Sequence, residues 1–326
     1  MVNSSKIFVD FSLPAEALAC LRAGTLDYQL CFPERPADSV LRDGGTDPGF
    51  AEAEIAFGQP DPGAVLSARK LKWVQVSSSG MTRYDTPAFR AGVAARGIRV
   101  CNSAHVYDHA CADHVFSFLL AQSRQLPVAL ATRDFGADAG WKAHRDACVP
   151  LTGQRLLIVG YGAIGERLRA LVAPYRMAVR AVRRRARGDE GVPVITDAAG
   201  LAAALGWADH VVNILPDSEE TRGFFQAARF AQMKAGAVFY NIGRGKTVCQ
   251  AALRDALVGG HLGGAWLDVT DPEPLPADHF LLKTPRCYVT PHVAGGHRGE
   301  AMTLVRHFLA NLRRYETGDP LMDFVM

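Results

Sequence analysis

Hydrophobic and polar positions along this chain follow two patterns, one typical of strands and one typical of helices. Short apolar runs rich in Val, Ile and Phe are separated by stretches whose apolar residues recur at helical spacing, which is the pattern of parallel α/β folds. In the first third, the expected strands are KIFVDF (6–11), EIAFG (54–58), LKWVQVS (71–77) and IRVCN (98–102), and the expected helices are PAEALACLRAG (14–24) and TPAFRAGVAARG (86–97). This part of the chain is therefore predicted to form one α/β unit.

A second series of the same kind begins with a long apolar helix, expected over residues 112–126. A strand, a glycine turn and a helix follow over 155–175, and further strands are expected within 177–182, 209–215, 236–243, 263–269 and 287–293. A last amphipathic helix, over 298–318, closes the chain, and we expect it to fold back onto the first unit. The prediction is two domains: residues 1–103 with 294–326, and residues 104–293.

Composition narrows the class of protein. A chain of 326 residues with 48% hydrophobic residues is long enough for two buried cores. The net charge of +3 is too balanced to indicate nucleic acid as the main partner. No apolar run is long enough to span a bilayer, and no signal-peptide pattern is visible at the N-terminus. The seven cysteines form no C-x-x-C motif, which favours a reducing, cytoplasmic location.

A glycine turn gives the first chemical signal. Gly160, Gly162 and Gly165 form G-x-G-x-x-G directly after the buried-strand run LLIV, and Ala163 and Ile164 begin the helix that follows. Such a turn lets the backbone approach a pyrophosphate and points free helix N–H groups at it. The motif in this context predicts dinucleotide binding, although an ordinary glycine-rich strand–helix turn has the same letters.

Three polar residues follow later strands: Arg244 in YNIGRG, Glu273 in LDVTDPEPLP and His292 in VTPHVAGG. Ligands of open parallel sheets bind beyond the carboxyl ends of the strands. An arginine can hold a carboxylate, and a histidine oriented by a carboxylate can move a proton. With a nicotinamide cofactor, these residues indicate a dehydrogenase of 2-hydroxy or 2-oxo acids. Each residue also has a structural alternative, as a surface pair, a loop carboxylate or a core histidine.

The sequence resembles the D-isomer-specific 2-hydroxyacid dehydrogenase family over nearly its whole length. The segments that carry the resemblance are ADHVFSFLLAQSR, LTGQRLLIVGYGAIG, VVNILPDSEETRG, NIGRGKTV, GAWLDVTDPEPLP and TPHVAGG. It implies an α/β fold of two Rossmann-like, doubly wound parallel-sheet domains, with a flavodoxin-like, discontinuous substrate domain. It also implies that Arg244 orients the substrate, that His292 is the acid/base and that Glu273 is its partner.

The resemblance places a substrate loop in the first domain, at QVSSSGMTRYD. Backbone N–H groups around Ser78, Ser79 and Gly80 would bind the substrate carboxylate. The family usually has a glycine where this chain has Ser78, and an aspartate where it has Thr82. These departures leave the detailed geometry of the loop open, and Arg83 beside it is expected to be exposed rather than to bind a second anion.

Further cofactor contacts follow from the same resemblance. The ribose side would lie near Leu215 and Pro216, and the nicotinamide riboside near Ile242 and Gly243. Asp268 would hydrogen-bond the carboxamide, or would be a structural carboxylate. Ala294 and Gly295 would lie against the nicotinamide.

The run MAVRAVRRRARG (177–188) bears on the choice of cofactor. The resemblance places Arg183 where relatives that prefer NAD usually carry an aspartate for the ribose hydroxyls. Arg183 and Arg184 would instead pair with a 2′-phosphate, so we expect NADPH to be preferred, with NAD possible. Arg185 and Arg187 are expected to face solvent. The alternative is a solvated basic loop.

Histidines 105 and 109 and Asp113 have the i, i+4, i+8 spacing of a metal site on a helix. Tyr107 and Asp108 indicate instead an irregular, partly solvated helix start, and neither the expected reaction nor the family needs a metal. No metal is therefore expected.

The function expected from the sequence is D-specific reduction of a small 2-oxo acid, such as glyoxylate or hydroxypyruvate, to the corresponding 2-hydroxy acid by a cytoplasmic enzyme. The alternative is an NAD(P)-binding regulatory protein of the corepressor type with little turnover. Family members are usually dimers, so a homodimer is expected. The segment FGADAGWKAHRDACVPLTG (135–153), which contains Trp141, would supply an arm-like contact between subunits.

Overall fold

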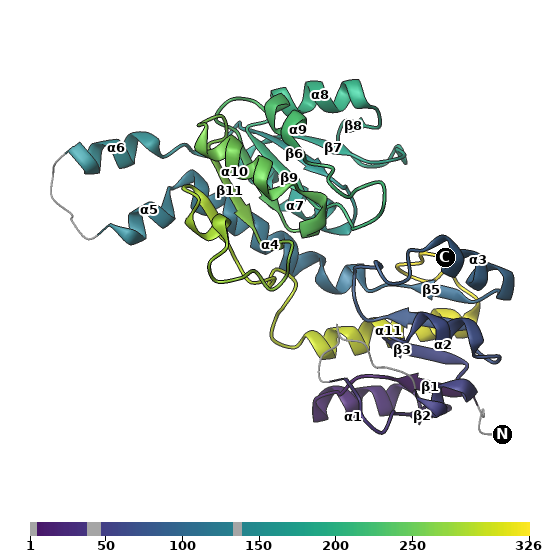
Figure 1. The fold of residues 1–326 in the computed structure, drawn as a ribbon. Helices are drawn as coiled ribbons and strands as arrows, with labels where there is room; N and C mark the ends of the chain where they lie inside the picture. Colours follow the sequence, from purple (N-terminus) through teal and green to yellow (C-terminus); the bar gives the residue numbers. More distant parts are fainter. Residues whose placement is uncertain (1–4, 38–46, 133–138) are drawn as a thin grey trace. The chain divides into compact units, whose positions relative to one another are not determined.

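The computed structural model describes residues 5–37, 47–132 and 139–326. It divides the chain into two compact units, Met1–Tyr107 with Gly296–Met326 and Asp108–Gly295 (Figure 1). The chain passes between the two units after Tyr107 and after Gly295, whereas the sequence pattern placed the divisions after Ser103 and after Val293.

The first unit is built on a five-stranded parallel sheet with the order β2-β1-β3-β4-β5. This is the flavodoxin-like order that was predicted. Its strands are β1 (Lys6–Val9), β2 (Gln29–Cys31), β3 (Ile55–Gly58), β4 (Trp73–Val76) and β5 (Arg99–Cys101). Its helices are α1 (Ala15–Gly24), the 3₁₀ helix η1 (Pro48–Glu52), α2 (Pro62–Ser67), α3 (Pro87–Arg96) and α11 (Glu300–Thr317).

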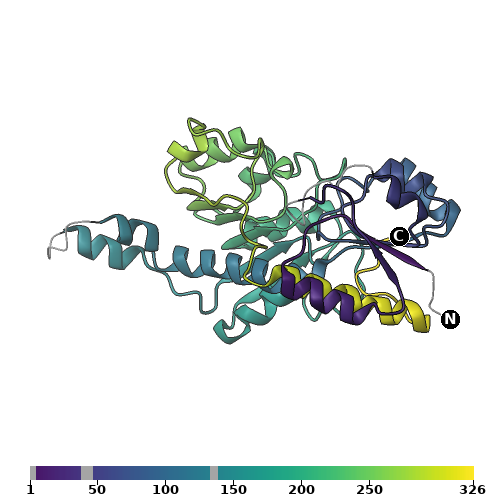
Figure 2. The ribbon, with the colours of Figure 1, turned by 90° about the horizontal axis from the view of Figure 1, so that it is seen from below.

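Helices cover both faces of this sheet, with α1 and α11 side by side on one face and α2 and α3 on the other (Figure 2). The strands have apolar side chains on both faces because both are buried. Phe308 of α11 stacks on Phe57 of β3 at 4.4 Å and on Trp73 of β4 at 5.3 Å between ring centroids. The last helix of the chain is therefore part of the core of the first unit.

The second unit is built on a seven-stranded parallel sheet with the order β12-β11-β10-β9-β6-β7-β8. The order reverses between β6 and β9, which makes their carboxyl ends the topological switch point of a Rossmann fold. The strands are β6 (Arg155–Val159), β7 (Ala178–Val182), β8 (Val194–Ile195), β9 (His210–Asn213), β10 (Val238–Asn241), β11 (Gly264–Leu267) and β12 (Cys287–Val289).

The helices of the second unit also form two layers. One core cluster joins α8, α9 and α10 to the sheet through residues such as Leu205, Phe230 and Leu253. On the other face, Phe118 of α4 packs on Trp266 of β11. The helices are α4 (Ala104–Ser123), α5 (Leu126–Ala131), α6 (Ala139–Ala147), α7 (Ala163–Val172), α8 (Ala198–Trp207), α9 (Ala227–Gln232) and α10 (Gln250–Val258), with 3₁₀ helices η2 (Ala173–Tyr175), η3 (Gly245–Thr247) and η4 (Phe280–Lys283).

Helix α4 begins regularly at Ala104, so the prediction of an irregular, partly solvated start at Tyr107 and Asp108 is wrong. Both residues are buried. The Tyr107 hydroxyl donates to the carbonyl of Ser77 at 2.9 Å and lies 3.0 Å from Oε1 of Glu300, and these bonds stabilise the first turn. Among the described residues, no group of His, Cys, Asp or Glu side chains is arranged to hold a metal ion.

Helices α5 and α6 extend away from the sheet of the second unit as an arm (Figure 1). The arm and the irregular segment between α6 and β6 expose large apolar side chains: Leu126, Val128, Leu130, Trp141 and Val149. Within the described part of the chain, every helix is too short or too polar to cross a bilayer.

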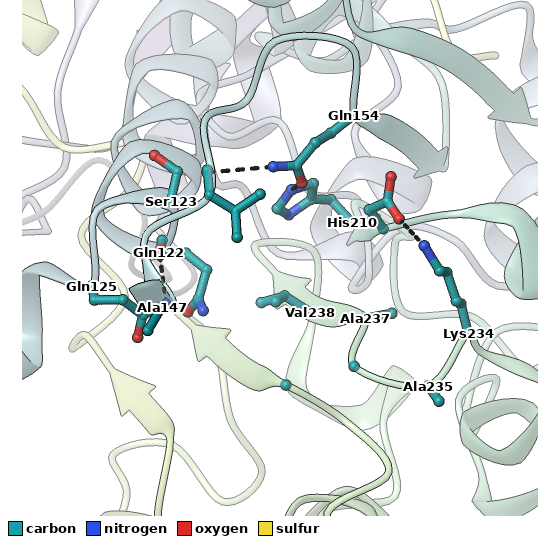
Figure 3. A pocket seen from close by; sticks show the side chains of 14 residues that line it. Gln122, Ser123, Gln125, Ala147, Gln154, His210, Lys234, Ala235, Ala237 and Val238 are labelled. Atoms are coloured by element: carbon teal, nitrogen blue, oxygen red, sulfur yellow. Dashed lines mark hydrogen bonds and ion pairs between the residues drawn. The ribbon is translucent and has the colours of Figure 1, made fainter. Parts of the chain in front are cut away.

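A half-open cavity of about 300 Å³ (Figure 3) lies at the amino ends of β9 and β10. The glycine turn lies at the opposite edge of the sheet, after the carboxyl end of β6. His210 lines it and is itself buried. Its Nδ1 lies 2.9 Å from the Tyr240 hydroxyl and its Nε2 lies 2.6 Å from Oε1 of Gln154. Burial lowers the pKa of His210 to about 4, so this histidine is neutral at physiological pH.

We expect His210 to make the protein sensitive to acid. The unfolded state binds this proton near pH 6.5 and the folded state only near pH 4, so the stabilisation is complete above pH 6.5 and is lost as the pH falls. Between pH 7 and pH 5 the free energy of unfolding should fall by about 2 kcal/mol more in the wild type than in His210→Gln. Urea unfolding at both pH values measures this difference, and identical pH dependence in the two proteins would rule it out.

Candidate active site

The glycine turn joins β6 to α7 at the switch point. Gly160 has φ +95°, and a Cβ there would lie 2.9 Å from the carbonyl carbon of Ile214, so both backbone conformation and space require glycine. A Cβ on Gly165 would lie 2.9 Å from the Tyr161 ring and 3.3 Å from the side chain of Ile158, so α7 lies close over β6 at this point. Gly162 precedes the helix and none of the described side chains caps it. The first N–H groups of α7 thus remain available to an anion.

The structure brings other expected cofactor residues to the same edge. A Cβ on Gly243, beyond β10, would lie 2.5 Å from the carbonyl oxygen of Leu215, beyond β9. Ile242 is buried beside them, whereas Pro216 is exposed. The ends of β6, β9 and β10 therefore contact one another around the glycine turn, which is the arrangement that a bound dinucleotide requires.

The arginine run follows β7, next to β6, and most of its side chains have acidic partners. Arg183 is largely buried, with its side chain 22% exposed, and its Nη1 lies 3.4 Å from Oε1 of Glu190. Arg184 is 85% exposed and pairs with Glu220 at 3.2 Å. Arg187 is exposed, as expected, and also pairs with Glu166 on α7. The run is thus more than a solvated basic loop.

Sequence reasoning missed Glu190. It lies seven positions after Arg183, and no spacing rule connects the two. The visible signal is its pair of flanking glycines, Gly188 and Gly191, which permit the reversal that brings the carboxylate back to the strand end.

The three residues expected to be catalytic lie beyond the ends of three neighbouring strands. Arg244 follows β10, Glu273 follows β11 and His292 follows β12. Nδ1 of His292 lies 3.0 Å from Oε2 of Glu273, and the two side chains are 41% and 39% exposed. Nη1 of Arg244 donates to the carbonyl of Gly243 at 2.6 Å. The set is therefore assembled within one unit.

Electrostatics support a proton-transfer role for the histidine. The hydrogen bond to Glu273 raises the pKa of His292, although burial and the nearby Arg244 guanidinium oppose the rise. Burial lowers the pKa of Arg244, and the Glu273 carboxylate opposes that change. The arginine stays charged, because its ordinary pKa lies far above neutrality. A histidine with a raised pKa can hold a proton near neutral pH and deliver it to a neighbouring oxygen.

Asp268 at the end of β11 holds the loop that carries His292. Its buried carboxylate accepts from the Thr290 hydroxyl at 2.6 Å and from the N–H groups of Val293 and Ala294 at 2.9 Å each. Nε2 of His114 lies 3.5 Å from Oδ1 of Asp268. Three bonds occupy most of the acceptor positions of a carboxylate, so the structural role of Asp268 is plain in these contacts. Ala294 and Gly295, expected beside the nicotinamide, continue this loop.

The expected substrate loop of the first unit is held by side-chain hydrogen bonds. The Ser78 hydroxyl donates to the carbonyl of Gly80 at 2.7 Å and accepts from the Gln59 amide at 2.8 Å. The Asn102 amide donates to the carbonyl of Ser79 at 2.8 Å. Serine is thus accommodated where the family usually has glycine. Arg83 is half-buried, with Nη1 3.4 Å from the carbonyl of Gln59, so the expectation of a simply exposed arginine is wrong.

An all-parallel sheet whose order reverses beside a glycine turn is the architecture of dinucleotide-binding domains. Comparison with known proteins agrees, because the family model described as "D-isomer specific 2-hydroxyacid dehydrogenase, NAD binding domain" matches residues 116–294, more than half of the chain. The chain belongs to the D-isomer-specific 2-hydroxyacid dehydrogenase family.

The names of similar proteins give more than one activity. The chain is 28% identical to human glyoxylate reductase/hydroxypyruvate reductase over 98% of this chain and 97% of the relative. It is 32% identical to D-3-phosphoglycerate dehydrogenase of Mycobacterium tuberculosis over 74% of this chain, but the match covers only 44% of that relative's length. The chain thus spans less than half of this longer relative.

A solved structure matches the whole chain. The NADPH-dependent glyoxylate/hydroxypyruvate reductase of Sinorhizobium meliloti, in complex with NADP and sulfate, is 27% identical, with a TM-score of 0.75 over 99% of this chain and 98% of that one. The two-unit α/β architecture is therefore shared along the full length.

We expect Glu273→Gln to lower the pKa of His292, because the variant removes the carboxylate that stabilises the imidazolium. NMR titration of the His292 ring protons in the full chain measures the midpoint. The matched control is Asp271→Asn, an exposed carboxylate two residues away, which should leave the midpoint unchanged. Equal midpoints in the wild type and Glu273→Gln would show that the pair does not control the proton.

Proposed function

We propose that this protein is an NAD(P)-dependent D-2-hydroxyacid dehydrogenase that reduces a small 2-oxo acid of the glyoxylate or hydroxypyruvate type. The observation that carries the proposal is the His292–Glu273 pair beside Arg244, at the same sheet edge as the glycine turn. The names of the human and Sinorhizobium relatives support the substrate class.

The residues of the second unit fit a bound dinucleotide. The N–H groups at the start of α7 would hold the pyrophosphate, with Gly162, Ala163 and Ile164 nearest to it. Leu215, Pro216, Ile242 and Gly243 would line the path toward the nicotinamide, and Ala294 and Gly295 would lie against the ring. The bound nicotinamide supplies or accepts the hydride.

The chain's own groups handle the substrate and the proton. The Arg244 guanidinium would bind the carboxylate and the carbonyl oxygen of the 2-oxo acid. Because Nδ1 of His292 points at Glu273, Nε2 is the nitrogen that can donate the proton to the developing alkoxide. The positive charges of Arg244 and protonated His292 would stabilise that alkoxide. Ser78, Ser79 and Gly80 would offer backbone N–H groups to the substrate carboxylate.

We also propose that NADPH is the preferred cofactor. Arg183 and Arg184 follow β7, where a carboxylate would otherwise select the ribose hydroxyls of NAD. The pair between Arg184 and Glu220 is highly exposed, so it contributes little and can give way to a phosphate. The NADPH-dependent Sinorhizobium relative supports this assignment.

Two further expectations remain proposals. The exposed apolar side chains on α5 and α6, Trp141 among them, support a homodimer formed through the arm. Exposed apolar patches often mark a surface that a partner protein covers. The arm residues 133–138 lie outside the described residues. The cytoplasmic location rests on the seven unpaired cysteines.

Steady-state oxidation of NADPH with a panel of 2-oxo acids tests the activity. We expect turnover of glyoxylate or hydroxypyruvate that falls as the pH rises through the raised pKa of His292, because reduction needs the protonated ring.

His292→Ala should lower kcat by about 10²–10⁴-fold with cofactor binding nearly intact. Arg244→Ala should chiefly impair substrates that carry a carboxylate. Tight dinucleotide binding without turnover of any acid would favour a regulatory protein instead.

The cofactor preference has a separate test. The double variant Arg183→Ala/Arg184→Ala should raise KM for NADPH by about tenfold or more and leave KM for NADH nearly unchanged, since only the 2′-phosphate loses its partners. Glyoxylate and hydroxypyruvate serve as substrates in both series. An equal change in the two KM values would contradict the preference.

A further inference from the structure

The segment Arg183–Gly191 after β7 is held together by hydrogen bonds to the carboxylate of Glu190. Oε1 of Glu190 accepts from the Arg187 N–H at 2.6 Å, and Oε2 accepts from the Gly188 N–H at 2.9 Å. Oε1 also lies 3.4 Å from Nη1 of Arg183. Gly188 has φ +91°, a left-handed conformation that turns the chain so that Glu190 returns to the strand end. An acidic group is therefore present beside the end of β7 in space, although not at the expected sequence position.

The same segment is attached to the helix that follows the glycine turn. The Tyr161 hydroxyl, from the turn itself, lies 3.4 Å from the Glu190 carbonyl oxygen, and Arg187 pairs with Glu166 on α7. The guanidinium of Arg169, also on α7, lies against Gly191. The loop that carries Arg183 is thus fixed relative to the backbone expected to bind the pyrophosphate.

A carboxylate at a strand end of this kind could have either of two roles. It could accept the ribose hydroxyls of NAD and repel a 2′-phosphate, as the usual aspartate does. It could instead hold an arginine in place for that phosphate. The contacts favour the second role, because the side chain of Glu190 is only 2% exposed and three donors already occupy its two oxygens.

Arg183 is more buried than Arg184, the next arginine of the run. Its side chain is 22% exposed and is held by Glu190, whereas that of Arg184 is 85% exposed and meets an exposed partner. A guanidinium held in place before the ligand arrives loses less conformational freedom on binding. The N–H groups of Arg187 and Gly188 point their positive ends at the Glu190 carboxylate. These dipoles weaken the repulsion between that carboxylate and a phosphate.

We infer that Glu190 is a positioning residue that holds Arg183 and its loop ready for the 2′-phosphate of NADPH. This inference deepens the proposed cofactor preference and rests on it. It assigns selectivity to a buried carboxylate that acts through Arg183 and does not touch the nucleotide. The N–H groups of Arg187 and Gly188 keep the carboxylate ionised, because they lower the pKa of Glu190.

Isothermal titration of the full chain with two fragments tests the role without any turnover. Adenosine 2′,5′-bisphosphate carries the 2′-phosphate, and 5′-AMP lacks it. We expect Glu190→Ala to weaken bisphosphate binding by about tenfold and to change 5′-AMP binding by less than about twofold. Asp189→Asn is the matched control, because its side chain is 73% exposed and adjacent, and it should leave both affinities unchanged.

A double-variant comparison shows whether Glu190 acts through Arg183. In an Arg183→Ala background, Glu190→Ala should have little further effect on bisphosphate binding, because the group it positions is gone. Full additivity of the two losses would contradict the inference. Glu190→Gln, which keeps the size of the side chain but loses its charge and one acceptor, should weaken bisphosphate binding in the same direction as alanine and guards against a folding defect.

Four other outcomes would overturn the inference. Equal weakening of both fragments would indicate a general collapse of the loop. Tighter bisphosphate binding by Glu190→Ala would show that the carboxylate only repels the phosphate. Weaker binding of 5′-AMP alone would make Glu190 a ribose ligand. If Arg183→Ala weakens bisphosphate binding and Glu190→Ala does not, the cofactor preference stands and the role of Glu190 falls. Failure to reduce any 2-oxo acid would leave these binding results untouched.

Discussion

The buried carboxylate of Asp268 is the contact on which the geometry of the candidate site depends. It joins the end of β11 to the loop after β12 through the Thr290 hydroxyl and two backbone N–H groups. The carbonyl of Asp268 also accepts the N–H of His292 at 2.9 Å. His292 is held with φ +52°, a left-handed conformation that is uncommon for residues other than glycine. These bonds fix the backbone from which its ring reaches Glu273.

The site therefore follows from sheet topology more than from any single motif. Parallel strands deliver their carboxyl ends to one edge, so residues as far apart in the chain as Gly160 and His292 share it. The fold leaves helix N–H groups and a charged arginine at this edge, and it places a cavity with a neutral His210 at the other. The candidate site and the His210 cavity are thus separated by the length of the strands.

Sequence pattern was sufficient for the features that depend on periodicity and chain order. The short edge strands β2 and β8 were not predicted, because two or three residues carry too little periodicity. The other strands, the glycine turn and the positions of Arg244, Glu273 and His292 at strand ends were predictable, because each follows from local spacing. The contacts of Glu190 and Asp268 were not. They depend on where a loop returns after a left-handed glycine, and on which of several acceptors a buried donor reaches. A residue pattern records neither.

The stacking of Phe308 on Phe57 and Trp73 has a consequence for the order in which the protein is made. The second unit is one continuous stretch, so all of its strands have been synthesised before α11 is complete. The first unit begins the chain yet lacks a core helix until residues 300–317 emerge. Until then Trp73 lacks the aromatic ring that stacks on it. The second unit can therefore fold on the ribosome before the first unit has its complete core.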